Sequence, residues 1–266
     1  MNILVLYRMY YGEDFIRQSI ESIYDVVDKL YIFAADRPWG DITEVTYKGK
    51  SHEIPNPIDN SLGVINELIA NYHRKISLSS YYQYTPDNQF TNIYNHLVLP
   101  NLNPNSKPDI IILMEPDMIW PWKELTNMLT WCENNRFDCI CSKQLEYWKT
   151  TEHYLPMRSR PGAIFYDMRN RDFLPITGKN GSIRSRKFMD YTLLNMGFCL
   201  SERNMFWKHL IGIGMSGKIH DSKPNENWYE DKWLNWDFNK NNRDLEISKG
   251  YEHNIPFALA NPPIFR

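Results

Sequence analysis

The sequence has few of the features that mark secreted, membrane-spanning or nucleic-acid-binding proteins. Four cysteines in 266 residues are too few for a disulfide scaffold and fit a reducing compartment. No apolar run approaches the roughly 20 residues that span a bilayer, and the N-terminus lacks a basic leader and a cleavage site. The 30 basic and 32 acidic residues nearly balance and are dispersed, which excludes a clear footprint for nucleic acid. We therefore expect a soluble, cytoplasmic protein with no transmembrane segment and no nucleic-acid partner.

Glycine is scarce where a phosphate-binding loop would need it. The first apolar run, residues 2–7, leads into YRMYYGED, which contains one glycine. A dinucleotide-dependent dehydrogenase needs close-approach glycines at such a turn. A nucleotidyltransferase needs a glycine-rich loop whose backbone N–H groups hold a triphosphate. This scarcity disfavours both classes.

The apolar pattern predicts one α/β domain. An apolar content of 42% and an aromatic content of 14% exclude a disordered chain. The runs at 2–7, 29–36 and 109–114 have the length of strands buried on both faces, and an apolar stripe predicts a helix between the first two, which gives a right-handed βαβ unit. That stripe consists of Ile16, Ile20, Ile23 and Val27. Further strands are predicted at 137–142 and 191–201, helices at 62–75, 90–102, after Pro121 and at 203–210, and long loops over 151–190.

Polar side chains stand at three strand ends of the predicted sheet. They are Tyr7 and Arg8 after the first strand, Asp36 after the second, and Glu115 with Asp117 after the third. Ligands of open α/β sheets bind beyond the carboxyl ends of the strands. Carboxylates there suit Mg²⁺ or Mn²⁺ held against a substrate phosphate. Alternatively, Glu115 and Asp117 cap the helix that follows, but an enclosed charge needs a partner.

Four stretches, taken in order, resemble inverting glycosyltransferases of the GT-A fold, especially family 2. LYRMYYGEDFIRQSIESIYDVVDKLYIFAADRPWG resembles the family's opening strand, turn, helix and second strand, and IILMEPDMIW looks like its Asp-x-Asp strand end. MGFCLSERNMFWKH resembles the strand and helix before the catalytic loop, and NWYEDKW looks like the Glu-Asp motif that carries the catalytic base. Together the stretches span residues 3–233.

The resemblance implies a single GT-A domain over residues 1–266, with a Rossmann-like, mixed, mostly parallel central sheet flanked by helices. Residues up to about 119 would form the nucleotide-sugar-binding half, and residues from about 120 the acceptor-binding and catalytic half.

The resemblance also implies a UDP- or GDP-sugar donor and a Mn²⁺ or Mg²⁺ ion. Asp117 matches the metal ligand. Glu115 stands where the family has its first Asp, which usually reaches the donor's ribose or a metal-bound water. Its longer side chain leaves its partner open. Asp36 matches the acidic residue that contacts the nucleoside, and Tyr7 and Arg8 flank the same donor pocket.

The Glu-Asp resemblance implies Asp231 as the general base of an inverting transfer, with Glu230 orienting the acceptor or the base. One base suffices because the leaving diphosphate needs charge stabilisation rather than a proton. The plainer interpretation is a solvated acidic pair on a helix. Trp228 is expected to stack on an acceptor sugar.

The remaining candidates are less specific. Some members of the fold complete the metal site with a histidine near the C-terminus, and the resemblance implies His253 as that ligand. A lone histidine is as often structural, and His220 is a weaker candidate. Trp233 and Trp236 are expected in the core.

The sequence thus predicts a metal-dependent glycosyltransferase that moves a sugar from a nucleotide-diphosphate sugar to a hydroxyl of a glycan or other acceptor, with inversion. A retaining outcome stays open. The alternatives are a sugar-phosphate nucleotidyltransferase and a non-catalytic carbohydrate-binding protein, which would explain the 9 Trp and 17 Tyr without Asp117 or Asp231.

Overall fold

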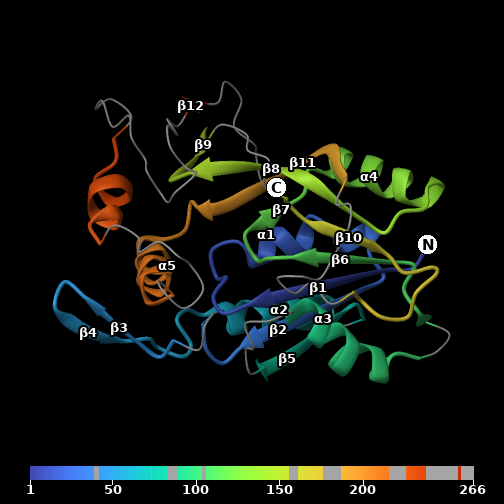
Figure 1. Cartoon of the computed structure of the whole chain (residues 1–266), viewed down its shortest axis with the longest axis horizontal. Helices are drawn as coiled ribbons and strands as arrows, with labels where there is room; N and C mark the ends of the chain where they lie inside the picture. Colours follow the sequence, from blue (N-terminus) through green and yellow to red (C-terminus); the bar gives the residue numbers. More distant parts are fainter. Residues whose placement is uncertain are drawn as a thin grey trace.

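A ten-stranded mixed sheet forms the centre of the protein (Figure 1). The computed structural model describes residues 1–38, 42–72, 74–82, 89–103, 106–155, 161–175, 187–215, 226–237 and 257–258. Four neighbouring strands of the sheet run parallel to one another in the order β5-β2-β1-β6. They are β1 (Ile3–Met9), β2 (Lys29–Ala35), β5 (Ile76–Tyr82) and β6 (Ile110–Met114).

The second half of the sheet contains both strand directions. β10 pairs antiparallel with β6 and with β8, so β8 runs in the direction of β1, and β11 runs parallel to β8. β11 also pairs with the short β7. These strands and the edge strands are β7 (Met118–Ile119), β8 (Cys139–Trp148), β9 (Thr150–Tyr154), β10 (Ile164–Asp167), β11 (Lys187–Phe198) and β12 (Phe257–Ala258). The predicted α/β class, with a mixed, mostly parallel central sheet flanked by helices, is confirmed.

Helices cover both faces of the sheet, as the apolar pattern requires. α1 (Ile16–Glu21), α2 (Ser61–Tyr72) and α4 (Trp122–Asn134) pack on one face. The other face is covered by the continuous segment of α3 (Gln89–Asn92), η2 (Ile93–Val98) and η3 (Leu99–Asn101). Within the described residues, no helix has both the length and the apolar composition to cross a membrane.

The first predicted helix is shorter than expected, although its apolar stripe is correct. Ile16, Ile20, Ile23 and Val27 are all at most 2% exposed. The α-helix ends at Glu21, and a 3₁₀ turn, η1 (Tyr24–Val26), completes the connection to β2. The stripe is therefore buried by two short helical pieces rather than by one helix.

Several strands lie where the sequence analysis predicted none. β9 and β10 occupy part of the segment predicted as long loops, and β5 follows α2. A hairpin of β3 (Glu44–Tyr47) and β4 (Lys50–Glu53) is also new. Its two turn residues, Lys48 and Gly49, have φ values of 48° and 74°, as in the tight turns that join antiparallel strands. These strands are short and lack long apolar runs, which explains why the pattern missed them.

A second core lies beyond the carboxyl ends of the parallel strands. It is built from α5 (Glu202–Gly214), the π-helix η5 (Tyr229–Leu234) and the β3–β4 hairpin. Figure 1 shows these elements on the side toward which the arrowheads of β8 and β11 point. The carboxyl ends of the parallel strands are therefore covered by this second core.

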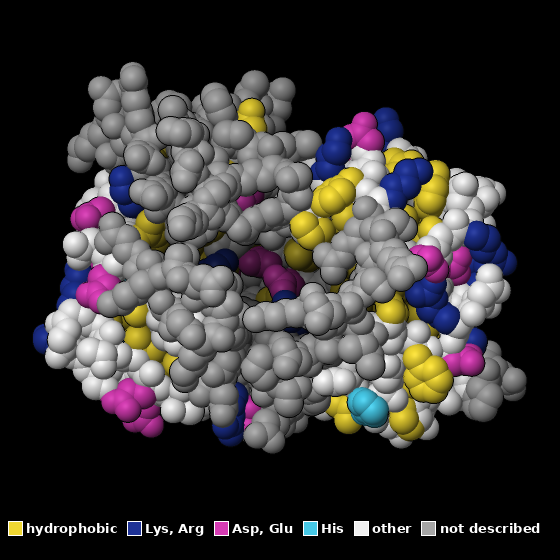
Figure 2. Space-filling model, in the orientation of Figure 1, with side chains coloured by type: hydrophobic (Ala, Val, Ile, Leu, Met, Phe, Trp, Pro, Cys, Tyr) yellow, Lys and Arg dark blue, Asp and Glu magenta, His cyan; other side chains and the backbone are white. Residues whose placement is uncertain are grey.

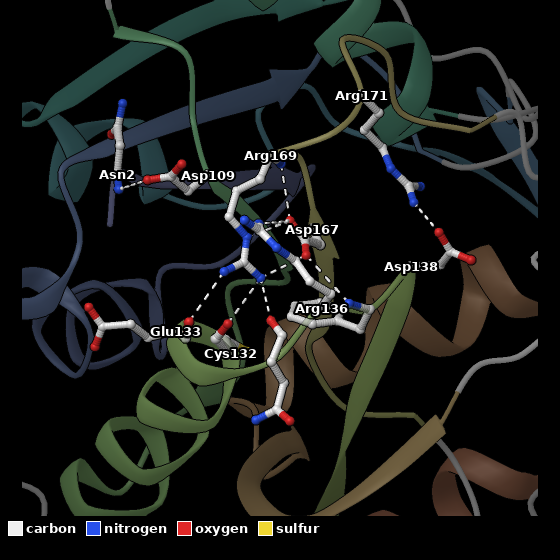
Figure 3. A network of polar contacts seen from close by, with 11 residues as sticks. Asn2, Asp109, Cys132, Glu133, Arg136, Asp138, Asp167, Arg169 and Arg171 are labelled. Atoms are coloured by element: carbon white, nitrogen blue, oxygen red, sulfur yellow. Dashed lines mark hydrogen bonds and ion pairs between the residues drawn. The ribbon is translucent and has the colours of Figure 1, made fainter.

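At the opposite edge, Arg169 ties the end of α4 to the end of β10 (Figure 3). Its Nε donates to Asp167 Oδ1 at 2.8 Å and its Nη2 to Oδ2 at 2.7 Å. The same guanidinium donates to the carbonyl oxygens of Cys132 and Glu133 at 3.1 and 3.3 Å, where a positive charge complements the helix dipole. Burial alone would raise the pKa of Asp167, but the hydrogen bonds from Arg169 and from backbone N–H groups lower it. This network is a structural brace, far along the sheet from the carboxyl ends.

Candidate functional site

Glu115 and Arg8 stand side by side at the ends of adjacent parallel strands. Tyr7 and Met114 are the last partners in the register of β1 and β6, so Glu115, the first residue beyond β6, lies beside Arg8, which is still paired with Phe33 of β2. Arg8 Nη2 lies 2.6 Å from Glu115 Oε1, and the guanidinium lies 4.9 Å from the centre of the Phe90 ring. Both side chains are partly exposed, so the ion pair adds little stability but fixes where Arg8 points. The partner of Glu115, left open by the sequence, is Arg8.

Asp117 has a largely buried carboxylate, one oxygen of which has no hydrogen-bond partner in the described part of the chain. Its backbone oxygen accepts a hydrogen bond from Met196 N at 2.8 Å, which places the side chain between β6 and β11. The side chain is 17% exposed. Oδ1 is buried and has no hydrogen-bond partner among the described residues, while Oδ2 lies 3.9 Å from Lys208 Nζ. Burial raises the pKa of Asp117 to about 6, against the lowering effect of the Lys208 charge.

Gly197 lets three polar side chains converge beside Asp117. A Cβ on Gly197 would lie 3.0 Å from Asp117 Oδ2 and 2.9 Å from both Lys208 Nζ and Asn195 Oδ1. Lys208, on α5, also donates to the Gly197 carbonyl at 2.6 Å. Figure 2 shows acidic side chains in a hollow near the middle of the view, with basic side chains beside them. The sequence analysis missed Lys208, Asn195 and Gly197. A glycine inside the predicted strand, in LLNMGF, is the signal that could have found this close approach.

Tyr7 does not face this site, which corrects the expected donor contact. Its side chain is fully buried, and its hydroxyl lies 3.0 Å from Ser19 Oγ and 3.8 Å from Met114 Sδ. Burial raises the pKa of the phenol. Tyr7 therefore packs α1 against the sheet.

Asp36 lies at the end of β2, as expected. Its Oδ1 is 3.4 Å from Arg37 Nε, and its backbone oxygen accepts a hydrogen bond from Asn56 Nδ2 at 2.6 Å. The side chain is 24% exposed. It is thus at the same sheet edge as Glu115, with β1 between their strands.

Glu230, expected to orient the acceptor or the base, holds the hairpin against η5. Its two carboxylate oxygens accept from the Tyr47 hydroxyl at 2.6 and 2.7 Å, and Lys48 Nζ donates at 2.8 Å. Burial acts to raise the pKa of Glu230, but these hydrogen bonds and the Lys48 charge lower it.

Asp231 is exposed on η5. Two residues later, Trp233 Nε1 donates to the Phe198 carbonyl at 2.9 Å, so Trp233 occupies the side of η5 that meets β11. Residues two apart lie on opposite sides of a helix. The described contacts therefore leave Asp231 on the outer side of η5 and do not bring it against Asp117.

Trp228 is buried, which corrects its expected contact with an acceptor sugar. It is 6% exposed, and its ring packs 6.0 Å from Trp148 and 5.8 Å from His209, measured between centroids. A ring covered by protein has no free face for a sugar. Trp233 and Trp236 lie in the same core at 4% and 9% exposure, as expected.

The donor set fits a divalent cation that takes further ligands from a substrate. In the described parts of the chain, no three His, Cys, Asp or Glu side chains are grouped to hold a metal, and His253 and His220 lie outside the described residues. Mg²⁺ and Mn²⁺ commonly bind through one or two carboxylates plus substrate phosphates. The unpartnered Asp117 Oδ1 is suited to such a site.

Comparison with known proteins gives structural likeness only. No protein-family model and no curated protein matches the chain. The fold is similar to S. aureus TarS 1–349, with 11% identity, TM-score 0.42, and coverage of 88% of this chain and 71% of that one. A mannosyltransferase, PcManGT from Pyrobaculum calidifontis in complex with GDP-Man and Mn²⁺, gives 8%, 0.46, 86% and 67%. The inositol-1-phosphate CTP transferase from T. maritima gives 6%, 0.40, 82% and 97%. At TM-scores this low, residues of this chain cannot be matched one by one to residues of the other proteins. The roles of its residues must therefore be argued from its own site.

Proposed function

We propose that the protein is a metal-dependent glycosyltransferase that moves a sugar from a UDP- or GDP-sugar to a hydroxyl of a glycan or other acceptor, with inversion. The observation that carries this proposal is the buried Asp117 Oδ1, which has no hydrogen-bond partner among the described residues. It lies where ligands of α/β sheets bind, and Arg8 and Lys208 stand on either side of the Glu115–Asp117 turn.

The donor's diphosphate matches the charges of this site. Asp117 would hold Mn²⁺ or Mg²⁺, which supplies neutralising charge for the leaving diphosphate. Lys208 Nζ, 3.9 Å from Asp117 Oδ2, is placed to bind a phosphate oxygen next to that carboxylate. Arg8, held by Glu115 at 2.6 Å, presents a second cation from the adjacent strand. Asp36 would accept hydrogen bonds from nucleoside hydroxyls.

Asp231 is proposed as the general base, on the resemblance of NWYEDKW and on its exposure. No described contact brings Asp231 against Asp117, but an exposed carboxylate is free to take a proton from an incoming hydroxyl that reaches it. Glu230, held by Tyr47 and Lys48, keeps η5 in position for this role. Replacing Asp231 by Asn should leave nucleotide-sugar affinity unchanged and abolish transfer. Equal transfer by wild type and Asp231→Asn would remove Asp231 from the mechanism.

The burial of the tryptophans weakens the carbohydrate-binding alternative. A binding module needs exposed aromatic faces, whereas Trp228, Trp233 and Trp236 are each at most 9% exposed. Trp122, at the start of α4, is the one tryptophan of the described residues that is largely exposed, at 56%.

The direct experiment is a thermal-unfolding screen of the full chain with UDP, GDP, CDP and their sugar conjugates, with and without Mn²⁺. A ligand at 100 times its Kd stabilises a protein by about 2.7 kcal/mol. We expect a nucleoside-diphosphate sugar to stabilise the protein only when Mn²⁺ is present. This stabilisation should be lost in Asp117→Ala and kept in the exposed control Glu152→Gln. Mass spectrometry then detects donor hydrolysis or transfer and the configuration of the product. Consumption of a nucleoside triphosphate with a sugar phosphate would identify a nucleotidyltransferase instead.

A further inference from the structure

The inward face of β8 becomes polar for half its length. Alternate residues of a strand share a face. This face of β8 begins with Ile140, which lies in the main core between the sheet and helices α1, α2 and α4, and ends with Trp148, which lies in the second core. Between them lie Ser142, Gln144 and Glu146, which are 0%, 7% and 9% exposed. Burying polar groups is unfavourable unless they are hydrogen-bonded. This polar stretch interrupts a face of the strand that is apolar at both ends.

The register of the sheet places this stretch next to Asp117. Glu146 is opposite Asn195 on β11, and Asn195 is opposite Met118 on β7, the residue that follows Asp117. Asn195 Nδ2 lies 3.4 Å from Gln144 Oε1, and Asn195 Oδ1 accepts from Gly197 N at 2.9 Å. The charge of Glu146 also raises the pKa of Asp117. Gln144, Glu146 and Asn195, hereafter the polar row, thus border the carboxylate of the candidate site.

The chemistry of the polar row suits the hydroxyl groups of a sugar ring. Gln144 has amide N–H donors beyond its contact with Asn195, and Glu146 supplies carboxylate acceptors. A sugar hydroxyl both donates and accepts, so a neighbouring amide and carboxylate can hold two adjacent hydroxyls. The charge of Glu146 would repel a phosphate, and an apolar group would offer the amide and the carboxylate no hydrogen bond.

We propose that Gln144 and Glu146, positioned by Asn195, bind hydroxyl groups of a sugar ring beside the diphosphate site and determine which ring configuration is accepted. This inference rests on the proposed function and deepens it. The ring can belong to the donor or to the acceptor, because both present the same hydroxyl chemistry.

The test uses Glu146→Gln, which removes the charge at constant shape, and Glu152→Gln as the matched control, an exposed carboxylate on the adjoining strand β9. Calorimetry with Mn²⁺ compares UDP with UDP-glucose and UDP-N-acetylglucosamine, and GDP with GDP-mannose. The affinity that the sugar adds to the nucleoside diphosphate should fall on the order of tenfold or more in Glu146→Gln. The affinity for the nucleoside diphosphate itself should not fall, which a merely structural role of Glu146 could not achieve. Gln144→Met, which lacks the amide, provides the second variant.

The outcomes separate the sources of the ring and the two proposals. If the affinity that the sugar adds to the nucleoside diphosphate is lost, the polar row binds the sugar of the donor. If that added affinity is unchanged but the KM for methyl glycoside acceptors is raised, the polar row binds the sugar of the acceptor. An unchanged added affinity and an unchanged acceptor KM in both variants would overturn the inference. Saturation-transfer NMR with free monosaccharides needs neither metal nor nucleotide. Wild type could show sugar contact that is lost in Glu146→Gln, while showing no Mn²⁺-dependent nucleotide binding. That result would support sugar binding by the polar row and refute the proposed function. No sugar contact in wild type by either method would refute the polar row.

Discussion

Replacing Asp117 by Asn should stabilise the metal-free protein while destroying its metal-dependent binding. Burial raises the pKa of Asp117 from 3.8 to about 6, and at about 1.4 kcal/mol per pKa unit this corresponds to about 3 kcal/mol. Because the folded state disfavours the charged form, this cost is absent below the ordinary pKa, appears as the pH rises and is complete above about 6. The amide of the Asp117→Asn variant carries no charge and avoids this cost.

The pKa of about 6 already includes the attraction of Lys208, whose Nζ lies 3.9 Å from Asp117 Oδ2. The loss of that attraction in Asp117→Asn is therefore part of the same 3 kcal/mol. The expected net gain is about 3 kcal/mol at pH 7.5 and under about 1 kcal/mol at pH 4. Gains of this kind are usual where a site is strained for function.

The measurement is urea unfolding of wild type, Asp117→Asn and the exposed control Glu152→Gln in EDTA at both pH values. Wild type should also lose Mn²⁺-dependent nucleotide binding as the pH falls through about 6, the pKa of Asp117. A loss of 1 kcal/mol or more in Asp117→Asn at pH 7.5 would show that the carboxylate already has a favourable protein partner. The cation-site reasoning would then be wrong.

Three further substitutions test other parts of the structure. Gly197→Ala would place a Cβ within 3.0 Å of three flexible polar groups, so we expect little change in the urea midpoint but about a tenfold loss of Mn²⁺-dependent nucleotide affinity in calorimetry. Asp167→Asn should lower the free energy of unfolding by about 3 kcal/mol at neutral pH. Because the pKa of Asp167 is lowered, that difference should disappear as the pH falls through the folded-state pKa, as measured by urea unfolding at several pH values. Tyr47→Phe removes the hydroxyl bound to Glu230 and should cost about 1.5 kcal/mol in thermal unfolding, with transfer in a mass-spectrometric assay changed far less than by Asp231→Asn.

The sequence was most informative where local pattern determines structure. The apolar runs located β1, β2 and β6, and the polar residues after them located the carboxyl edge. Their side-chain directions were harder, although β1 shows that the information was present. Tyr7 alternates with Ile3 and Val5, which all face the main core, whereas Leu4 and Leu6 lie on the other face. The position of a residue at the end of a strand indicates that it lies near the carboxyl ends of the sheet, whereas alternation along the strand indicates which face its side chain occupies. Tyr7 lies near the carboxyl end of β1, but its side chain lies on the face that packs in the core.

The remaining site residues depend on pairings that no local pattern reveals. Lys208 reaches Gly197 only because α5 packs back over the end of β11. Glu146 and Asn195 are 49 positions apart in the numbering and become neighbours through the parallel β8–β11 pairing. The contact of Glu230 with Tyr47 could not be predicted for the same reason, since Tyr47 lies in a hairpin that the pattern missed.

The charges of the described site residues support the proposed need of a nucleotide for a metal. Among the described residues, three carboxylates meet there, Glu115, Asp117 and Glu146, against two cations, Arg8 and Lys208. In the proposed function, a diphosphate would add at least two negative charges beside these three carboxylates. A divalent cation entering with it would offset that charge, and the phosphates would give the cation further oxygen ligands. Metal and nucleotide should therefore each raise the affinity for the other by the same factor, so the Mn²⁺ affinity measured without nucleotide must be lower than with it.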